Sequence, residues 1–256
     1  MLAVRSSAGQ GRYEAPFEWD VVFEAISRPG GRPLVWCHGN NGSATGDYNF
    51  YNAELRLLAQ RHTVMAADLG GNTFGNDTGI TRVGQAIDRL VALGASEPAI
   101  LVGASMGGAV ALNFAVRHPE RVAAVAGIIP ALTLSVPPGN PAEAAIDAAY
   151  PPAYDPGNPA HLDHDPLAFA GDLPADMPIG IWYSTTDPLC LPETAIAFGA
   201  ARTQTRLVPF GPYGHSGIDI AVPSAAEWLA SLDVVQPSGN AYGQGAYGSG
   251  IYGGAS

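Results

Sequence analysis

The stretch ILVGASMGGAV, residues 100–110, constrains the fold of this chain more than any other part of the sequence. An apolar run of strand length leads directly into Ser105, and glycines lie two positions to either side of this serine, at Gly103 and Gly107. The residues that follow have a helical pattern, so the sequence predicts a sharp strand-to-helix turn with the serine at its tip. Two interpretations are open at this point: a tight turn that only needs small residues, or a turn that presents a nucleophile.

Short apolar runs alternate with longer amphipathic segments along most of the chain, which favours parallel strands joined by crossover helices. The expected strands are DVVFEAI, PLVWC, HTVMAAD, AILVGA, AAVAGIIP, IGIWYS and TRLVPF. The expected helices are residues 47–61, residues 81–93 with Thr81 as N-cap, the segment that begins with GGAVALNF after the Ser105 turn and ends at Pro119, LPETAIAFGAA and PSAAEWLASL. The alternation predicts an α/β domain with a parallel sheet.

The length of 256 residues is sufficient for a full core, and we expect one domain over residues 1–235. A proline-rich segment, about 131–177, interrupts the strand and helix alternation and contains one short helical pattern, PAEAAIDAAY. A crossover helix with its loops needs about 20 residues, so we interpret the surplus as a small lid. Residues 236–256 form a Gly/Ser/Tyr-rich tract, for which a flexible tail is the default interpretation.

The composition excludes several classes of function. Apolar residues make up 47% of the chain and charged residues 14%, yet no apolar run is long enough to span a bilayer and the N-terminus lacks a signal-peptide pattern. We therefore expect a soluble protein without Sec export, either cytoplasmic or virion-associated. The net charge of −11 disfavours nucleic acid and anionic membranes as partners. All twelve basic residues are arginine, which excludes lysine chemistry, and we expect Cys37 and Cys190 to be ordinary thiols.

A serine hydroxyl is a poor nucleophile at neutral pH, so it needs a base, and the base needs an orienting carboxylate. His215 in GPYGHSG follows the expected strand TRLVPF, and Asp187 in STTDPLCLP follows the expected strand IGIWYS. Each residue thus lies at the C-terminal end of a strand, where ligands bind in open α/β sheets. Three other acidic residues nearby in the sequence are alternatives for the carboxylate: Asp172, Asp176 and Asp219.

From about Asp20 to Leu232 the chain resembles the α/β-hydrolase superfamily. LVWCHGNNG is similar to its oxyanion loop, GASMGG to its nucleophile elbow, and RHPERV to the end of the following helix. TTDPLCLP and GHSG resemble the acid and histidine loops, and all five segments occur in the family's order. The resemblance implies a mostly parallel sheet of about eight strands, helices on both faces, and an antiparallel edge supplied by the first part of the chain.

By this resemblance Ser105 attacks the substrate carbonyl, His215 takes and returns the proton, and Asp187 fixes the imidazole. The oxyanion would be held by the backbone N–H groups of Met106 and Asn40; Asn41 is the alternative to Asn40. The implied activity is hydrolysis of small-molecule, lipid or acylated-glycan carboxylic esters, without a cofactor. Acyl transfer, thioester hydrolysis, peptidase activity and perhydrolysis use similar triads and stay open.

A role in a different class rests on the tail, whose Gly/Tyr repeat resembles Tyr-Gly-rich repeats of some bacteriophage virion proteins. The chain would then be an assembly or binding module that docks to another protein through residues 236–256, or a virion-associated esterase. We expect His38 to brace its loop rather than act as a base. In HLDHD we expect a solvated lid loop rather than a metal site, although ligand-type side chains gather there: His161, Asp163, His164 and Asp165.

Overall fold

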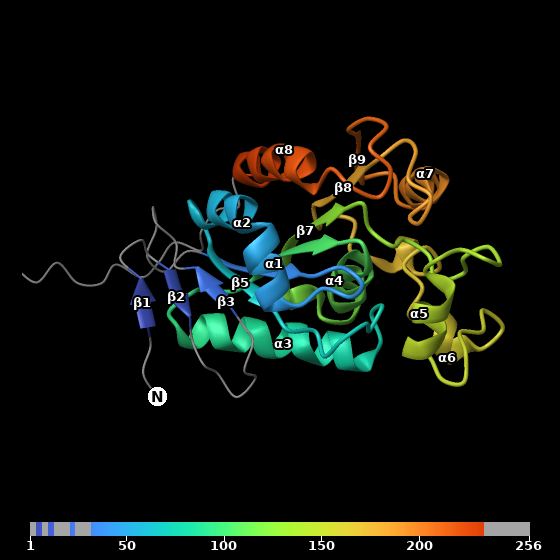
Figure 1. Ribbon diagram of the computed structural model, residues 1–256, viewed down its shortest axis with the longest axis horizontal. Helices are drawn as coiled ribbons and strands as arrows, with labels where there is room; N and C mark the ends of the chain where they lie inside the picture. Colours follow the sequence, from blue (N-terminus) through green and yellow to red (C-terminus); the bar gives the residue numbers. More distant parts are fainter. Residues whose placement is uncertain (1–3, 7–9, 13–20, 24–31, 233–256) are drawn as a thin grey trace, which may run out of the picture.

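The computed structural model describes residues 4–6, 10–12, 21–23 and 32–232 of the chain (Figure 1). Within these residues nine strands form one sheet in the order β1-β2-β3-β5-β4-β6-β7-β8-β9. The bounds are β1 (Val4–Ser6), β2 (Gln10–Arg12), β3 (Val21–Phe23), β4 (Pro33–Cys37), β5 (Thr63–Ala67), β6 (Ala99–Ala104), β7 (Val122–Ile128), β8 (Ile179–Tyr183) and β9 (Arg206–Pro209). The predicted tail, and with it the docking role, lies outside the described residues.

The strands β4 to β9 pair in parallel, and β1, β2 and β3 form an antiparallel edge next to β5. The predicted α/β-hydrolase architecture, a mostly parallel sheet with an N-terminal antiparallel edge, is therefore confirmed. Strands β3 to β9 correspond to the seven expected segments, and the unexpected short strands β1 and β2 bring the described sheet to nine, against the implied number of about eight. The apolar runs PLVWC and AILVGA coincide with β4 and β6, whose residues are all buried.

Helices cover both faces of the sheet, as predicted (Figure 1). Their bounds are α1 (Ala44–Phe50), α2 (Asn52–Ala59), α3 (Asp77–Ala92), α4 (Met106–Arg117), α5 (Glu143–Ala149), α6 (Pro159–Leu162), α7 (Pro192–Ala201) and α8 (Ile218–Ser231), with short 3-10 helices at Pro119–Arg121 and Ala170–Asp172. None of the helices in the described part of the chain is long and apolar enough to cross a membrane.

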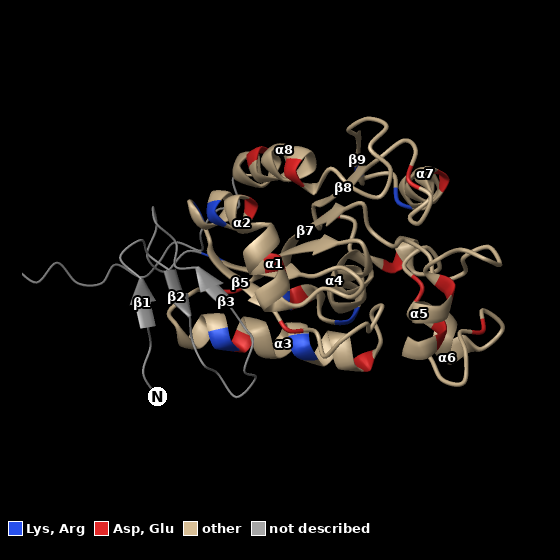
Figure 2. Cartoon of the chain, viewed as in Figure 1, with Lys and Arg blue, Asp and Glu red and all other residues tan. Residues whose placement is uncertain are grey.

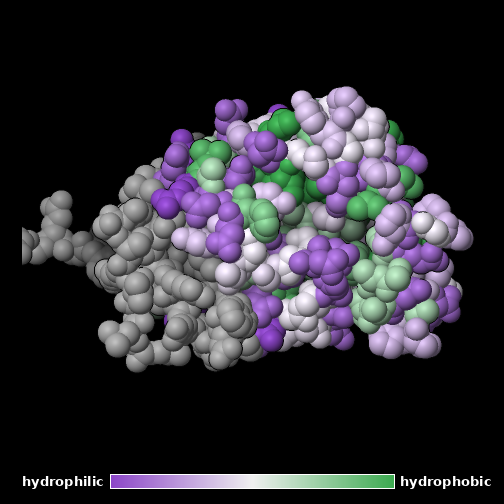
Figure 3. Space-filling view, viewed as in Figure 1, coloured by the Kyte–Doolittle hydropathy of each residue, from purple (hydrophilic) through white to green (hydrophobic). Residues whose placement is uncertain are grey.

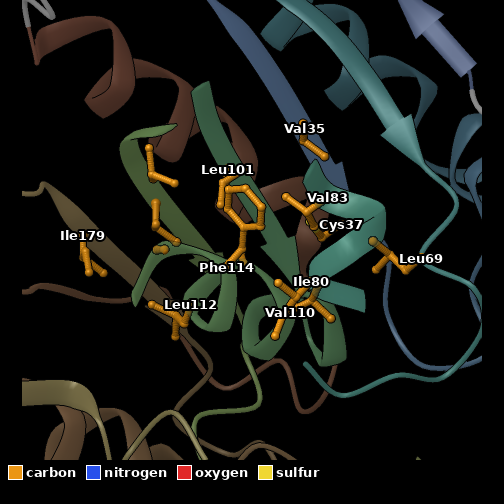
Figure 4. Close-up of a cluster of buried hydrophobic side chains, with 14 of the residues drawn as sticks. Val35, Cys37, Leu69, Ile80, Val83, Leu101, Val110, Leu112, Phe114 and Ile179 are labelled. Carbon is orange, nitrogen blue, oxygen red and sulfur yellow. The ribbon is translucent and has the colours of Figure 1, made fainter. Parts of the chain in front are cut away.

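Strand β4 shows how the sheet divides the core in two. Val35 and Cys37 pack with α3 and α4 on one face, in the cluster that contains Phe114 (Figure 4). Leu34 and Trp36 point to the other face, where residues of α1, α2 and α8 form the second cluster. Successive strand residues alternate between faces, so a strand buried on both sides must be apolar throughout.

Three helix predictions were wrong in their bounds. The segment expected as one helix over 47–61 is two helices separated at Tyr51, whose φ of −112° departs from helical geometry. Helix α3 begins before Thr81, because the side chain of Asn76 caps it by accepting hydrogen bonds from two backbone N–H groups. Helix α8 begins at Ile218 and contains Pro223, the residue at which the sequence predicts its start.

The lid segment, residues 131–177 between β7 and β8, carries α5 and α6. Asp165 is buried there, and its Oδ2 accepts hydrogen bonds from Leu134 N and Thr133 Oγ1, each at 2.8 Å. The half-buried His164 ring bonds the Gly75 carbonyl through Nδ1 at 2.8 Å. The prediction that HLDHD is a solvated loop is thus wrong for these two residues, because they attach the lid segment to its own start and to the loop before α3.

Candidate active site

Ser105 lies between β6 and α4 in a backbone conformation with φ +50° and ψ −118°. The surrounding glycines allow this turn to form. A Cβ on Gly103 would overlap with the backbone of Gly107, and a Cβ on Gly107 would overlap with the Cys37 carbonyl group. Strand β4, strand β6 and helix α4 therefore approach one another at positions without side chains, which leaves Ser105 at the tip of the turn.

Ser105, His215 and Asp187 form one hydrogen-bonded chain. The distance from His215 Nε2 to Ser105 Oγ is 2.9 Å, and that from His215 Nδ1 to Asp187 Oδ2 is 2.8 Å. The other carboxylate oxygen, Asp187 Oδ1, accepts backbone N–H groups from Leu189 at 2.8 Å and Cys190 at 2.9 Å. Asp187 is 2% exposed, so these bonds fix its orientation in a nearly dry environment.

This arrangement determines which nitrogen of His215 carries the proton and which accepts a hydrogen bond. An ionised carboxylate only accepts hydrogen bonds, so the proton of a neutral imidazole lies on Nδ1, facing Asp187. Nε2 is then the acceptor of the Ser105 hydroxyl proton. The alternative acids of the sequence analysis are exposed: Asp172, Asp176 and Asp219.

The two predicted oxyanion donors belong to the start of α4 and to the loop after β4. Met106 is the first residue of α4, so its N–H has no acceptor within the helix. The loop after β4 runs close to the serine, because a Cβ on Gly39 would lie 3.6 Å from the Ser105 Cβ. In this loop the Asn41 N–H already donates to Asn72 Oδ1 at 2.7 Å, which leaves Asn40 as the better candidate.

His38 supports the same loop. It is buried, its Nδ1 lies 2.9 Å from the Gly39 carbonyl oxygen, and its Nε2 accepts the Leu69 N–H at 3.4 Å. These contacts agree with the predicted bracing role.

A cavity of about 470 Å³ opens beside Ser105. Its lining residues come from the loop after β4, from α1, from the end of β7, from the lid segment and from the loops that carry Cys190 and His215. Apolar residues are visible between α8 and β7 in the space-filling view (Figure 3).

Four non-glycine residues in the described part of the chain have positive φ, and all four line this cavity: Asn41, Phe74, Ser105 and Ile129. Backbone strain is thus concentrated at this site, as is typical of functional sites.

Sequence reasoning missed two cavity residues, Cys190 and Asp47. The Cys190 thiol contacts the Ser105 hydroxyl, and burial together with the Asp187 charge raises its pKa. Among the described residues, Asp187, Cys190 and His215 form the group with ligand atoms within 4.8 Å of one another, although two of them are already bonded together. Cys190 could have been found from its position three residues after Asp187; nothing in the sequence marks Asp47.

The family model that matches this chain describes the alpha/beta hydrolase fold, and it covers residues 32–174, more than half of the sequence. The chain therefore belongs to the α/β-hydrolase fold family.

Solved structures of hydrolases share this architecture. Paleococcus ferrophilus monoacylglycerol lipase is 18% identical, with a TM-score of 0.60 over 83% of this chain and 98% of that chain. Est1E from Butyrivibrio proteoclasticus is 15% identical, with a TM-score of 0.63 over 90% and 97% of the two chains. The meta-cleavage product hydrolase CumD from Pseudomonas fluorescens IP01 is 17% identical, with a TM-score of 0.59 over 84% and 96%. No curated protein is similar enough in sequence to match this chain.

Proposed function

We propose that this protein is a serine hydrolase that cleaves carboxylic esters through an acyl-enzyme intermediate. The observation that carries the proposal is the hydrogen-bonded chain Ser105–His215–Asp187 beside a mostly apolar cavity. The alignment of a hydroxyl, an imidazole and a buried carboxylate is the arrangement that activates a serine toward acyl groups.

In the acylation step the Ser105 Oγ bonds to the ester carbonyl carbon while its proton passes to His215 Nε2. The carbonyl oxygen becomes an oxyanion, held by the N–H groups of Met106 and Asn40, each donor contributing about 3 kcal/mol of transition-state stabilisation. The tetrahedral intermediate then collapses: the bond to the alcohol oxygen breaks, and the alcohol leaves with the proton from His215. Asp187 stabilises the imidazolium that exists between these two proton transfers.

In the deacylation step water attacks the acyl carbon as it gives a proton to His215 Nε2. As the new tetrahedral intermediate collapses, the bond between the acyl carbon and Ser105 Oγ breaks and His215 gives its proton to Oγ, so the acid product leaves and the enzyme returns to its initial state. The raised pKa of the Cys190 thiol keeps that group protonated, so it does not compete with Ser105 as nucleophile.

An ester substrate is favoured over a peptide by the character of the cavity. Apolar side chains from the lid segment, among them Val136 and Ile146, line one side of it, which suits an acyl or alcohol chain. The similar structures include a protein named as a monoacylglycerol lipase, which supports the same direction at the level of fold.

The test is hydrolysis of p-nitrophenyl esters from acetate to palmitate by wild type, Ser105→Ala and Ser216→Ala. Ser216 is the matched control, because it is an exposed serine next to His215 whose hydroxyl donates to the Tyr213 carbonyl. We expect kcat/KM to fall by about 10³-fold or more in Ser105→Ala and to stay near wild type in Ser216→Ala.

Labelling with a fluorophosphonate tests whether Ser105 is an activated nucleophile, independently of whether the protein hydrolyses esters. We expect mass spectrometry to find the label on Ser105, and not in the His215→Ala variant. Labelled Ser105 without turnover of any ester would overturn the esterase assignment and direct the search to thioesters and peptides. Absence of both labelling and turnover would overturn the hydrolase mechanism itself.

A further inference from the structure

The described residues that line the cavity include a carboxylic acid but no lysine or arginine. None of the described residues that line it is arginine, and the chain contains no lysine. Asp47 in α1 does line it, and the second carboxylate of the site, Asp187, is already bonded to His215. A carboxylate on a substrate would therefore meet the Asp47 carboxyl group, and no lysine or arginine among the described residues of this wall.

Asp47 is held in place by contacts with β4 and with the loop that follows it. Its exposed fraction is 5%, and its Oδ2 accepts a hydrogen bond from the indole N–H of the fully buried Trp36. Its Oδ1 lies beside Gly42 in the loop after β4, close enough that a Cβ on Gly42 would come within 3.2 Å of it. Burial raises the pKa of Asp47 by desolvating its charged form, whereas the Trp36 hydrogen bond and the nearby His38 act in the opposite direction.

A second acceptor lies in the same wall. The side-chain oxygen Oδ1 of Asn40 is buried and has no hydrogen-bond partner among the described residues. An acceptor that lacks a donor, such as Asn40 Oδ1, favours a ligand that brings N–H or O–H groups and disfavours a carboxylate, which only accepts. Charge and hydrogen-bonding capacity thus point to the same kind of ligand.

We propose that the site takes uncharged esters and rejects esters whose acyl or alcohol part carries a carboxylate, and that Asp47 is the residue that enforces this selection. The inference rests on the proposed esterase function and specifies its substrate class. Repulsion between two unit charges across a cavity in a protein lowers kcat/KM for the anionic ester by about 10- to 100-fold.

The net charge of −11 could also repel anions, since acidic residues occur on several helices, including the lid helix α5 (Figure 2). The two sources differ in their response to salt. The field of exposed charges is screened within about 10 Å at 0.1 M salt, whereas a buried charge next to the substrate is screened far less. Selectivity caused by Asp47 should therefore persist at high ionic strength.

The experiment compares two size-matched pairs of esters. In one pair the acyl chain ends in a carboxylate or a carboxamide: the p-nitrophenyl monoester of adipic acid and its terminal amide. In the other pair the alcohol part carries the difference: para-acetoxybenzoate and para-acetoxybenzamide. The readout is the ratio of kcat/KM for the uncharged ester to that for the anionic ester, in wild type, Asp47→Asn and Asp219→Asn, at low and high salt.

Asp47→Asn keeps an oxygen for the Trp36 N–H and removes the charge. Asp219 is the matched control, because it is an exposed acid whose charge acts on Tyr51, a residue of the cavity. We expect the ratio for at least one pair to be about tenfold or more in wild type, to persist at high salt, to fall about tenfold in Asp47→Asn and to be unchanged in Asp219→Asn.

Three results would overturn the inference. Wild type could cleave the anionic and uncharged members of both pairs equally. The ratio could stay the same in Asp47→Asn, or it could vanish at high salt in wild type, which would assign the selection to the surface field. If no ester is cleaved above the Ser105→Ala background, the esterase proposal fails and the inference fails with it, whereas turnover without selectivity overturns the inference alone.

Discussion

At the scale of single residues, the notable feature of the site is that both carboxylate oxygens of Asp187 accept hydrogen bonds. One carboxylate oxygen contacts His215 and the other accepts two backbone N–H groups from its own loop. All three contacts call for an acceptor on Asp187, so a carboxylate satisfies them better than a neutral polar group of the same size.

Replacing Asp187 with Asn tests this requirement. The amide can satisfy the two loop N–H groups with its oxygen, but its NH₂ then faces His215 Nδ1 and forces the imidazole proton onto Nε2. His215 can no longer accept the Ser105 proton, so we expect kcat for the preferred ester to fall by about 10⁴-fold. The thermal midpoint should change by only a few degrees, since volume and loop bonds are kept.

Asp172→Asn is the control for this variant, because it removes an exposed acid from the lid segment. Its kcat should equal that of wild type. If Asp187→Asn were as active as Asp172→Asn, Asp187 would have no role in orienting the base.

At the scale of elements, the close contact of β4, β6 and α4 determines the geometry of the turn at Ser105. Glycine is required where these backbones meet, because a side chain at Gly107 would occupy the position of the Cys37 carbonyl group. Gly84 in α3 differs: the nearest heavy atom to a Cβ there is Phe114 Cε2 at an ordinary 3.5 Å.

The different surroundings of Gly107 and Gly84 predict opposite effects on stability when each glycine is replaced by alanine. Gly107→Ala forces backbone to move and should lower the free energy of unfolding by about 3 kcal/mol, which corresponds to about 6–12 °C in the thermal midpoint for a chain of this size. Gly84→Ala should be neutral or stabilise by about 0.5–1 kcal/mol, since alanine favours helix. Thermal denaturation followed by circular dichroism measures both, and equal effects would contradict the packing of the elbow.

At the scale of the whole molecule, the two hydrophobic clusters share the same central strands. Trp36 and Trp182 are fully buried in one cluster, and Cys37 is fully buried in the other, although Trp36 and Cys37 are neighbours on β4. Since neither cluster can lose its strands without exposing the other, the two faces should unfold as one unit.

Urea denaturation tests this cooperativity with one probe for each face. In a Cys190→Ser variant only the Cys37 thiol remains, and its burial raises the pKa to about 12, which makes it unreactive in the folded protein. We expect the midpoint of thiol labelling, measured in short pulses, to coincide with the midpoint of tryptophan fluorescence. Labelling of Cys37 at a clearly lower urea concentration would show that the face with α3 and α4 opens separately.

The sequence by itself determined the central strands and the turn at Ser105. The runs PLVWC and AILVGA are apolar throughout because both faces of β4 and β6 are buried. Such uninterrupted apolar runs can be recognised in the sequence alone. The order of Ser105, Asp187 and His215, each after an expected strand, also placed three side chains that the structure brings into hydrogen-bond contact. Parallel strands end at a common edge, so sequence order was sufficient to predict their proximity.

Only the tertiary structure decided what depends on contacts between distant segments. Helix α3 begins early because Asn76 caps it, and Asp165 is buried because donors from the start of the lid segment surround it. Asp47 lies in the cavity wall because α1 packs over Trp36 on the sheet, a placement that no local pattern specifies. The residues expected to perform the chemistry were readable from the sequence, whereas the residue proposed to select the substrate became visible only in the folded cavity.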